Sequence, residues 1–286
     1  MLISELTDEN SPRFYKRMRD FLVLHEKTCV SLMSRFLKHD ARFFFAHDDD
    51  VIRAVFSFSL GGQVLHCFED DALCESAELL SLCKSHFSQF GKRNLFSIIG
   101  TRAGTDFFAR VFSEQFQKNP SSSCDYILMV YKKIPYTLTR PKRFSRVQII
   151  RAAPCDVDAL APIQAAYERE EVVVDASQFS EENSRALLKK SLTAGTVFAL
   201  KGDDAFVAKL SINAQGEHVV QFGGIFTVPA FRRQGIARFL VGVLSRKHAD
   251  EGWAVVLFVK KSNVAAVNLY KKCGFEAFSE YKICYY

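Results

Sequence analysis

A segment rich in proline and basic residues, 132–145 (KKIPYTLTRPKRFS), divides the sequence into two halves that follow the same order of elements. It holds two prolines among a cluster of lysines and arginines, a composition typical of a linker. A chain of 286 residues is also longer than one ordinary domain requires. We therefore expect a first domain over residues 1–136 and a second over residues 146–286.

The first half alternates helical and strand patterns. Residues 11–38 place apolar side chains at three- and four-residue steps, which predicts helix. Residues 42–60 read as two strands around an acidic turn, and residues 63–68 as a third. The remaining expected elements are a helix at 72–90 that ends at Gly91, a strand at 95–100, a helix at 106–116 and a strand at 125–132.

The second half repeats this alternation, which implies helices packed on a sheet. Ser180 is expected to cap a helix that follows it. The expected elements are a strand at 148–151, helices at 156–169 and 180–195, a hairpin that turns at 202–204, a strand at 218–228, a helix at 235–250, a strand at 254–259, a helix at 263–272 and two short strands at 276–280 and 282–286.

Composition argues against several classes of function. The net charge of +6 is spread along the chain, whereas nucleic-acid binders concentrate basic residues in a stripe. The eight cysteines form no CxxC pair and no zinc spacing, so we expect reduced thiols and no metal. The sequence shows no signal-peptide pattern and no apolar run long enough for a membrane span. These features predict a cytoplasmic protein without nucleic-acid or membrane partners.

Residues 223–244 (GGIFTVPAFRRQGIARFLVGVL) predict a strand, a basic turn and a helix. The first amides of a helix have no partner within it, and the helix dipole makes this end positive. A diphosphate can therefore bind there. Gly235 and Ala237 are small enough for its close approach. The pattern RxxGxA alone also fits a basic turn before an ordinary helix.

A second motif follows in Asn263–Phe275 (NVAAVNLYKKCGF), after a predicted strand. The two motifs, in this order and on these elements, resemble the GNAT acetyltransferase superfamily. The whole chain resembles a two-domain bacterial GNAT subgroup whose first domain is a degenerate GNAT-like unit, through segments at 42–62, 95–101, 125–130 and 149–175. The resemblance implies an α/β fold of two GNAT-like domains, each a mixed, mostly antiparallel sheet flanked by helices, the second being catalytic.

The same resemblance implies an acetyl-CoA-dependent N-acetyltransferase that moves an acetyl group directly to a primary amine of a small molecule or amino acid. The alternatives are a protein acetyltransferase acting on lysine or an N-terminus, and a non-catalytic acyl-CoA sensor. Tyr270 would protonate the departing thiolate, unless it only packs, and Asn263 would contact the CoA arm, cap its helix, or both. The other CoA-binding positions are Ile225, Phe226, Thr227, Val228, Arg232, Arg233, Gln234, Gly235, Ile236, Ala237 and Arg238.

No general base stands where the family resemblance places one. Those positions hold Phe258 and Gln221, neither of which accepts a proton at neutral pH. The remaining candidates are Glu217 or His218 at the start of the central strand, and the acids near the substrate approach, Glu170, Glu171 and Asp175. An amine that arrives partly neutral would need no base.

The first half carries Glu69-Asp70-Asp71 at the point equivalent to the basic turn. Three carboxylates would repel a diphosphate, so we expect no CoA there. This half would shape the acceptor cleft, bind the acceptor or form a dimer surface. The sequence is compatible with a monomer or a homodimer.

Overall fold

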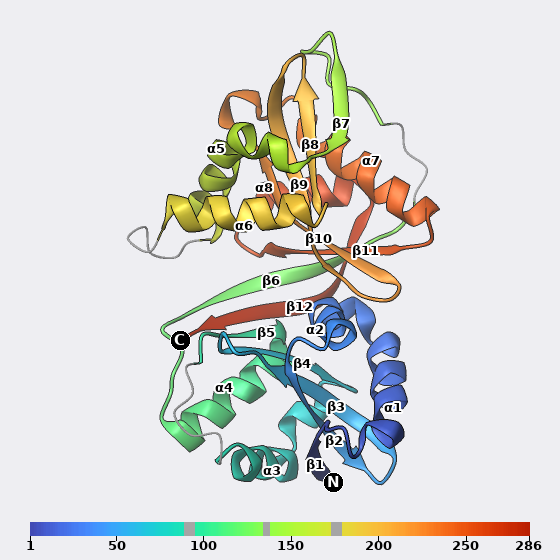
Figure 1. Ribbon diagram of the computed structural model, residues 1–286, viewed down its shortest axis with the longest axis vertical. Helices are drawn as coiled ribbons and strands as arrows, with labels where there is room; N and C mark the ends of the chain where they lie inside the picture. The colour runs from blue at the N-terminus through green and yellow to red at the C-terminus, as the bar shows by residue number, and fades with distance from the viewer. Residues whose placement is uncertain (89–94, 134–137, 173–178) are drawn as a thin grey trace.

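A computed structural model describes residues 1–88, 95–133, 138–172 and 179–286. Its strands are β1 (Leu2–Glu5), β2 (Arg42–Asp48), β3 (Val51–Phe58), β4 (Gln63–Phe68), β5 (Ser97–Thr101), β6 (Ser122–Tyr131), β7 (Val147–Arg151), β8 (Val197–Gly202), β9 (Ala205–Gln215), β10 (Val219–Thr227), β11 (Ala254–Lys260) and β12 (Phe275–Tyr285). Its helices are α1 (Ser11–Leu24), α2 (Glu26–Lys38), α3 (Ala77–Ser88), α4 (Arg102–Phe116), α5 (Val157–Tyr167), α6 (Glu181–Thr193), α7 (Ile236–Asp250) and α8 (Val264–Lys272). Two lobes share one mixed sheet of these twelve strands (Figure 1).

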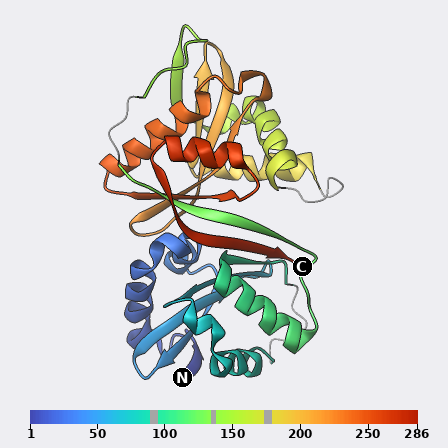
Figure 2. The same cartoon turned by 180° about the vertical axis from the view of Figure 1, so that it is seen from behind.

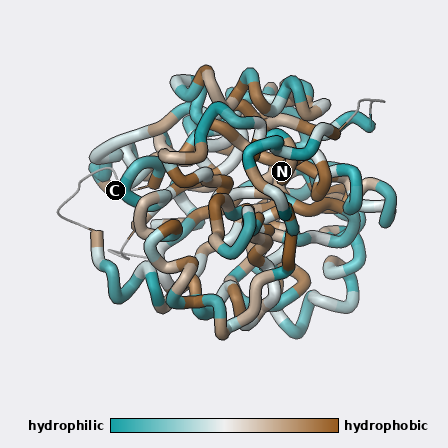
Figure 3. The backbone as a smooth tube through the Cα atoms, turned by 90° about the horizontal axis from the view of Figure 1, so that it is seen from above, coloured by the Kyte–Doolittle hydropathy of each residue, from teal (hydrophilic) through white to brown (hydrophobic). Residues whose placement is uncertain are grey.

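Each lobe packs helices on both faces of its part of the sheet (Figure 1). The strand β2 illustrates this arrangement, because successive side chains of a strand point to opposite faces of the sheet. Phe43 and Phe45 pack beneath α1 and α2, whereas Phe44 packs beneath α3 and α4. In the second lobe α5 and α6 cover one face, and α7 and α8 cover the other. Figure 3 shows the apolar segments gathered in the interior.

Most expected elements are present, with differences at their ends. The helix expected over 11–38 is divided at His25 into α1 and α2. The helix expected from 106 begins at Arg102. The helix expected over 72–90 consists of a short 3-10 turn and α3, and its proposed end at Gly91 lies outside the described residues. Ser180 caps α6 as predicted, since its side chain accepts from the amide of Asn183.

The two halves exchange their last strands. The sheet order is β1-β2-β3-β4-β5-β12-β6-β11-β10-β9-β8-β7, so β12 pairs with β5 of the first half. Conversely, β6 pairs with β11 of the second half. Figures 1 and 2 show β6 and β12 side by side between the lobes. The division of the chain at 136 and 146 therefore stays a prediction, because each half completes the sheet of the other.

The expectation of two short final strands was wrong. One long strand, β12, replaces them, with an irregularity in its pairing to β6 between Ala277 and Ser279. A bulge of this kind bends a strand without ending it. The polar residues in EAFSE resemble a break in the sequence, but the ladder continues on both sides of them.

The strands β10 and β11 separate halfway along their length. They pair in parallel only from Val219 to Phe222 on β10. Beyond that point β10 contains a bulge relative to β9, between Gly223 and Phe226, and Gly224 has a φ of 56°. A positive φ favours glycine, which has no Cβ to clash. The separation leaves one edge of β10 unpaired beside the start of α8.

Candidate active site

The basic turn lies between the unpaired end of β10 and the start of α7. A single 3-10 turn, Pro229–Phe231, follows the strand, and α7 begins directly after Gly235. Gly235 adopts a φ of 78° and no side chain caps the helix. The first amides of α7 are therefore available to a ligand, at the positive end of the helix dipole.

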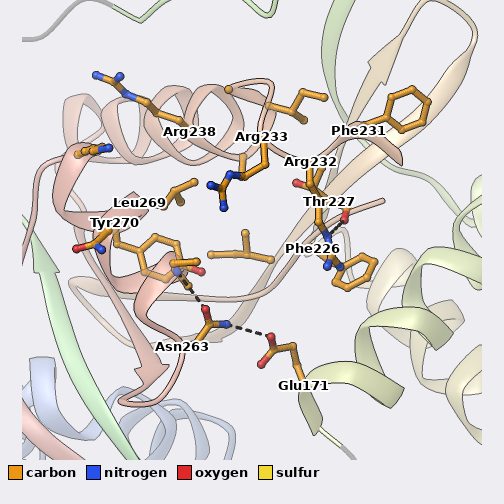
Figure 4. A pocket seen from close by; sticks show the side chains of 18 of the residues that line it. Glu171, Phe226, Thr227, Phe231, Arg232, Arg233, Arg238, Asn263, Leu269 and Tyr270 are labelled. Carbon is orange, nitrogen blue, oxygen red and sulfur yellow. Dashed lines mark hydrogen bonds between the residues drawn. The ribbon is translucent and has the colours of Figure 1, made fainter. Parts of the chain in front are cut away.

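A cavity of about 660 Å³ lies in front of these amides (Figure 4). It brings together both sequence motifs and the acidic pair that follows α5. The predicted site residues that line it are Glu170, Glu171, Ile225, Phe226, Thr227, Arg232, Arg233, Gly235, Ile236, Ala237, Arg238, Asn263 and Tyr270. Val228 does not line it, and Gln234 lines a neighbouring hollow instead.

The three arginines of the turn are not equivalent. Arg232 pairs with Glu170 across the cavity mouth at 2.7 Å, and its Nε donates to the carbonyl of Thr227 at 3.1 Å. Within the described residues, the guanidinium groups of Arg233 and Arg238 have no hydrogen bond or ion pair. Figure 4 shows Arg233 directed into the cavity and Arg238 directed away from it. Arg233 is thus the cation best placed to meet a phosphate beside the helix amides.

Asn263 caps α8 and also reaches an acid. Its Oδ1 accepts from the amide of Ala266 at 3.0 Å, and its Nδ2 donates to Glu171 Oε1 at 3.1 Å (Figure 4). Lys260 Nζ lies 3.6 Å from the other oxygen of Glu171. These contacts hold the carboxylate of Glu171 at the inner end of the cavity.

Tyr270 stands on the face of α8 that borders the cavity. Its side chain is 8% exposed and packs against Phe275, with ring centroids 6.1 Å apart. Burial raises the pKa of this phenol above its ordinary value of 10. The hydroxyl therefore stays protonated at neutral pH, as a general acid must.

A second cavity, of about 260 Å³, adjoins the first through Glu171, Asn263 and Tyr270. Its other walls include five aromatic residues, Tyr126, Tyr167, Phe222, Phe258 and Tyr285. Two of these, Tyr126 and Tyr285, come from the exchanged strands. Sequence reasoning missed Tyr126 and Tyr285, because no local pattern reveals that β6 and β12 change places.

Lys209 is the other residue that the sequence did not single out. It is 1% exposed on β9, and its Nζ donates to the carbonyl of Gly224 at 2.9 Å. The same Nζ lies 4.6 Å from the centroid of the Tyr167 ring. Burial lowers its pKa to about 7. The contact holds the bulge of β10 that opens the cleft.

Lys209→Met should change how stability depends on pH. The unfolded chain protonates this amine near its ordinary pKa of 10.5, while the folded protein does so only near 7. Between these values the unfolded state binds more protons, so the wild type gains stability as pH rises. The difference in free energy of unfolding between wild type and variant should grow by up to about 1.4 kcal/mol per pH unit. Urea denaturation measures this difference. The same difference at pH 7.5 and at pH 9 would contradict a lowered pKa for the buried amine.

Glu217 and His218 lie at the opposite end of β10. Glu217 pairs with Arg19 of α1, with Arg19 Nε donating to Oε2 at 2.8 Å. The side chain of His218 is exposed. Val219 and Thr227, the two ends of β10, are about eight residue steps apart, and neither Glu217 nor His218 lines either cavity. The structure therefore does not bring these two candidate bases to the cavity, whereas it does bring Glu171. Asp175 lies outside the described residues.

The described residues contain no group of three or more His, Cys, Asp or Glu side chains arranged to hold a metal ion. None of the helices within these ranges has the length and apolar character that a membrane span requires.

Comparison with known proteins agrees with this geometry. Residues 160–275 match the model of the acetyltransferase (GNAT) family. A 70-residue stretch is 37% identical to N-alpha-acetyltransferase 20 of Dictyostelium discoideum, covering 23% of this chain and 40% of that protein. The chain thus spans about two fifths of the length of this curated relative.

Two solved structures are similar over nearly the whole chain. One is an acetyltransferase of the GNAT family from Colwellia psychrerythraea, with a TM-score of 0.60 and 12% identity over 100% of both chains. The other is a tandem GNAT protein from the clavulanic acid biosynthesis pathway, with a TM-score of 0.60 and 10% identity over 99% of this chain and 97% of that chain. At these identities the similarity establishes the fold.

The segment matched by the family model contains the turn before α7, the capping Asn263 and Tyr270. These are the residues that surround the larger cavity. Residues 160–275 therefore form a domain that matches the GNAT family of acetyltransferases, and the whole chain has the fold of a tandem GNAT protein.

Proposed function

We propose that the protein transfers an acetyl group from acetyl-CoA directly to a primary amine of a small molecule. The observation that supports this most is the junction of two cavities at Glu171, Asn263 and Tyr270. One cavity faces the free amides of α7 and the other has aromatic walls. A transferase needs such adjoining sites, because holding two reactants in contact removes much of the entropic barrier.

The larger cavity suits acetyl-CoA. The amides of residues 235–238 and the guanidinium of Arg233 would hold its diphosphate. The unpaired edge at Ile225–Thr227 would hydrogen-bond the amides of its pantetheine arm, as an added strand does. The buried hydroxyl of Thr227 has no hydrogen-bond partner within the described residues, so it is available to the same arm. Backbone N–H groups near Phe226 would polarise the thioester oxygen.

The smaller cavity suits a compact amine. Its volume of about 260 Å³ lies below the ~300–1,000 Å³ usual for drug-sized ligands. The aromatic walls would contact an apolar body, and the carboxylate of Glu171 would attract the ammonium group and take its proton. Tyr270 would protonate the sulfur as the amine bonds to the acetyl carbon.

Glu171→Gln tests this assignment. The amide keeps the shape of the side chain but cannot accept a proton, so we expect kcat/KM for the amine to fall about 100-fold at pH 7. The loss should shrink as pH rises, because a larger fraction of the amine arrives neutral. Initial rates between pH 7 and 9.5 measure this, with Glu170→Gln as the matched control. A variant with the pH profile of the wild type would remove Glu171 from the mechanism.

A protein N-terminus is the second candidate acceptor. The 37% identity to N-alpha-acetyltransferase 20 over 70 residues favours it, and that protein's name states that it acts on α-amino groups. The enclosed aromatic walls of the smaller cavity argue instead for a short ligand. Release of CoA with a panel of small primary amines and short peptides separates the two. Acetyl-CoA binding without release from any acceptor would indicate a sensor.

A further inference from the structure

A third hollow, of about 450 Å³, lies on the other side of the turn before α7. One wall is the start of α7, through Gly235, Arg238 and Phe239. The opposite wall is the segment 138–143, which connects the two halves. Because Gly235 and Arg238 also line the larger cavity, the hollow continues directly from the place proposed for the diphosphate.

The charge of this hollow is entirely positive. Its lining includes four cations, Arg140, Lys142, Arg143 and Arg238, and no acid. Nowhere in the described ranges does any of the four side chains pair with a carboxylate. Elsewhere on this protein exposed arginines commonly have acidic partners, as Arg13 and Arg17 do with Asp50. Four unpaired cations around one hollow favour an anionic ligand.

The segment is fixed to the second lobe on both sides of Arg143. Pro141 is buried, and the ring of Phe144 packs against Phe231, with centroids 5.6 Å apart. Ser145 Oγ donates to Asp203 Oδ1 at 2.7 Å. The guanidinium of Arg143 itself lies 5.0 Å from the ring centroid of Phe231. The cations therefore stand at a defined place beside the turn.

Acetyl-CoA carries a second phosphate, on the 3′ position of the same ribose whose 5′ position bears the diphosphate. A diphosphate on the α7 amides must therefore place this phosphate close to the turn. We propose that Arg140, Lys142 and Arg143 bind the 3′-phosphate of acetyl-CoA. Leu138, Pro141 and Phe239 supply an apolar surface for the adenine. The inference rests on the proposed function, and it gives the connecting segment a part in recognising the co-substrate.

The competing location is the far end of the larger cavity, along α8. Lys272 and Asn268 line it there. That side offers one lysine, whereas the connecting segment offers three cations in addition to Arg238. The two locations predict different sensitive residues, so a substitution on each side distinguishes them.

The test compares CoA with 3′-dephospho-CoA, which differ only in this phosphate. Calorimetry gives the dissociation constant of each ligand for wild type, for Arg140→Gln/Lys142→Gln and for Lys272→Gln. The double variant leaves Arg143 in place against Phe231. The loss of even one charged hydrogen bond weakens binding by about tenfold or more, so we expect the wild type to prefer CoA by at least that factor. The double variant should lose most of this preference and bind 3′-dephospho-CoA as the wild type does. Lys272→Gln should retain the preference.

Two results would overturn the inference: an unchanged preference in Arg140→Gln/Lys142→Gln, or its loss in Lys272→Gln. Either leaves the proposed function standing, provided that wild type binds 3′-dephospho-CoA. If the wild type binds neither CoA nor 3′-dephospho-CoA, the proposed function is contradicted, and the proposed 3′-phosphate site with it. The substituted side chains are exposed, and thermal unfolding of the variants checks that the fold is retained.

Discussion

Tyr270→Phe should lower kcat about 100- to 1,000-fold while leaving the affinity for acetyl-CoA nearly unchanged. Phenylalanine preserves the ring that packs against Phe275, so only the hydroxyl is lost. Without that proton donor the thiolate of CoA must leave unprotonated or take a proton from water. Steady-state rates with a responsive amine, together with calorimetric titration of acetyl-CoA, measure the two quantities separately.

Tyr281→Phe is the matched control. Tyr281 is also a buried tyrosine whose pKa burial raises, but it lies on β12, stacks behind Phe258 and lines neither cavity. We expect kcat to stay within about twofold of wild type for this variant, because a side chain that touches no reactant changes the barrier little. Equal kcat in Tyr270→Phe and wild type would show that Tyr270 only packs.

The raised pKa of Tyr270 also defines the pH range of this role. Burial favours the neutral phenol of Tyr270, so its pKa lies above the ordinary value. The acid form is then complete throughout the neutral and mildly alkaline range. A rate that decreases as the pH falls below 8 must therefore reflect protonation of the amine or of the group that accepts its proton. The Glu171→Gln variant tests that acceptor.

The parts of the site that the sequence predicted are local in the chain. The turn around Gly235 and the cap at Asn263 each depend on a few consecutive residues whose backbone preferences and hydrogen bonds are set by neighbours. Their spacing along the chain also follows from a strand and a helix of ordinary length. Local rules therefore predicted α7 and α8, whereas the roles of Asn263 and Tyr270 came from the resemblance of the two motifs to the GNAT family, and both residues line the larger cavity.

The parts that it missed depend on distant contacts. The aromatic wall of the smaller cavity combines Tyr126 with Tyr285, which meet there only because β6 and β12 are exchanged. Lys209 looks like an ordinary strand residue until the bulge at Gly224 lies against it. Glu217 seemed free to act as a base, but Arg19, nearly two hundred positions earlier, pairs with it. Pairing between halves leaves no periodic signal in the sequence.

Glu26 holds the two halves together at a second place besides the exchanged strands. It stands at the start of α2, and its side chain is 2% exposed. Its Oε1 accepts from three consecutive amides of the second half, at 2.5, 3.0 and 3.2 Å. These amides belong to Glu217, His218 and Val219, at the turn between β9 and β10. A Cβ on Gly216 would come within 2.0 Å of the same oxygen, so glycine permits the close approach.

Glu26→Ala should therefore lower the free energy of unfolding by about 3 kcal/mol or more. It leaves three amides, one buried and two partly buried, without their acceptor, and hydrogen bonds to a charged group contribute ~1.5–3 kcal/mol each. Urea denaturation followed by circular dichroism measures the change. Because β6 and β12 interlock the lobes, we expect one cooperative transition in wild type and variant, with the midpoint moved to lower urea.

Glu217→Gln is the control at the same junction. It removes the partly exposed pair with Arg19, and such pairs contribute only ~0–1 kcal/mol. The same variant should leave turnover unchanged, since Glu217 lines neither cavity. A Glu26→Ala protein as stable as Glu217→Gln would mean that the three amides find water or another acceptor. The carboxylate would then contribute nothing to the joining of the halves.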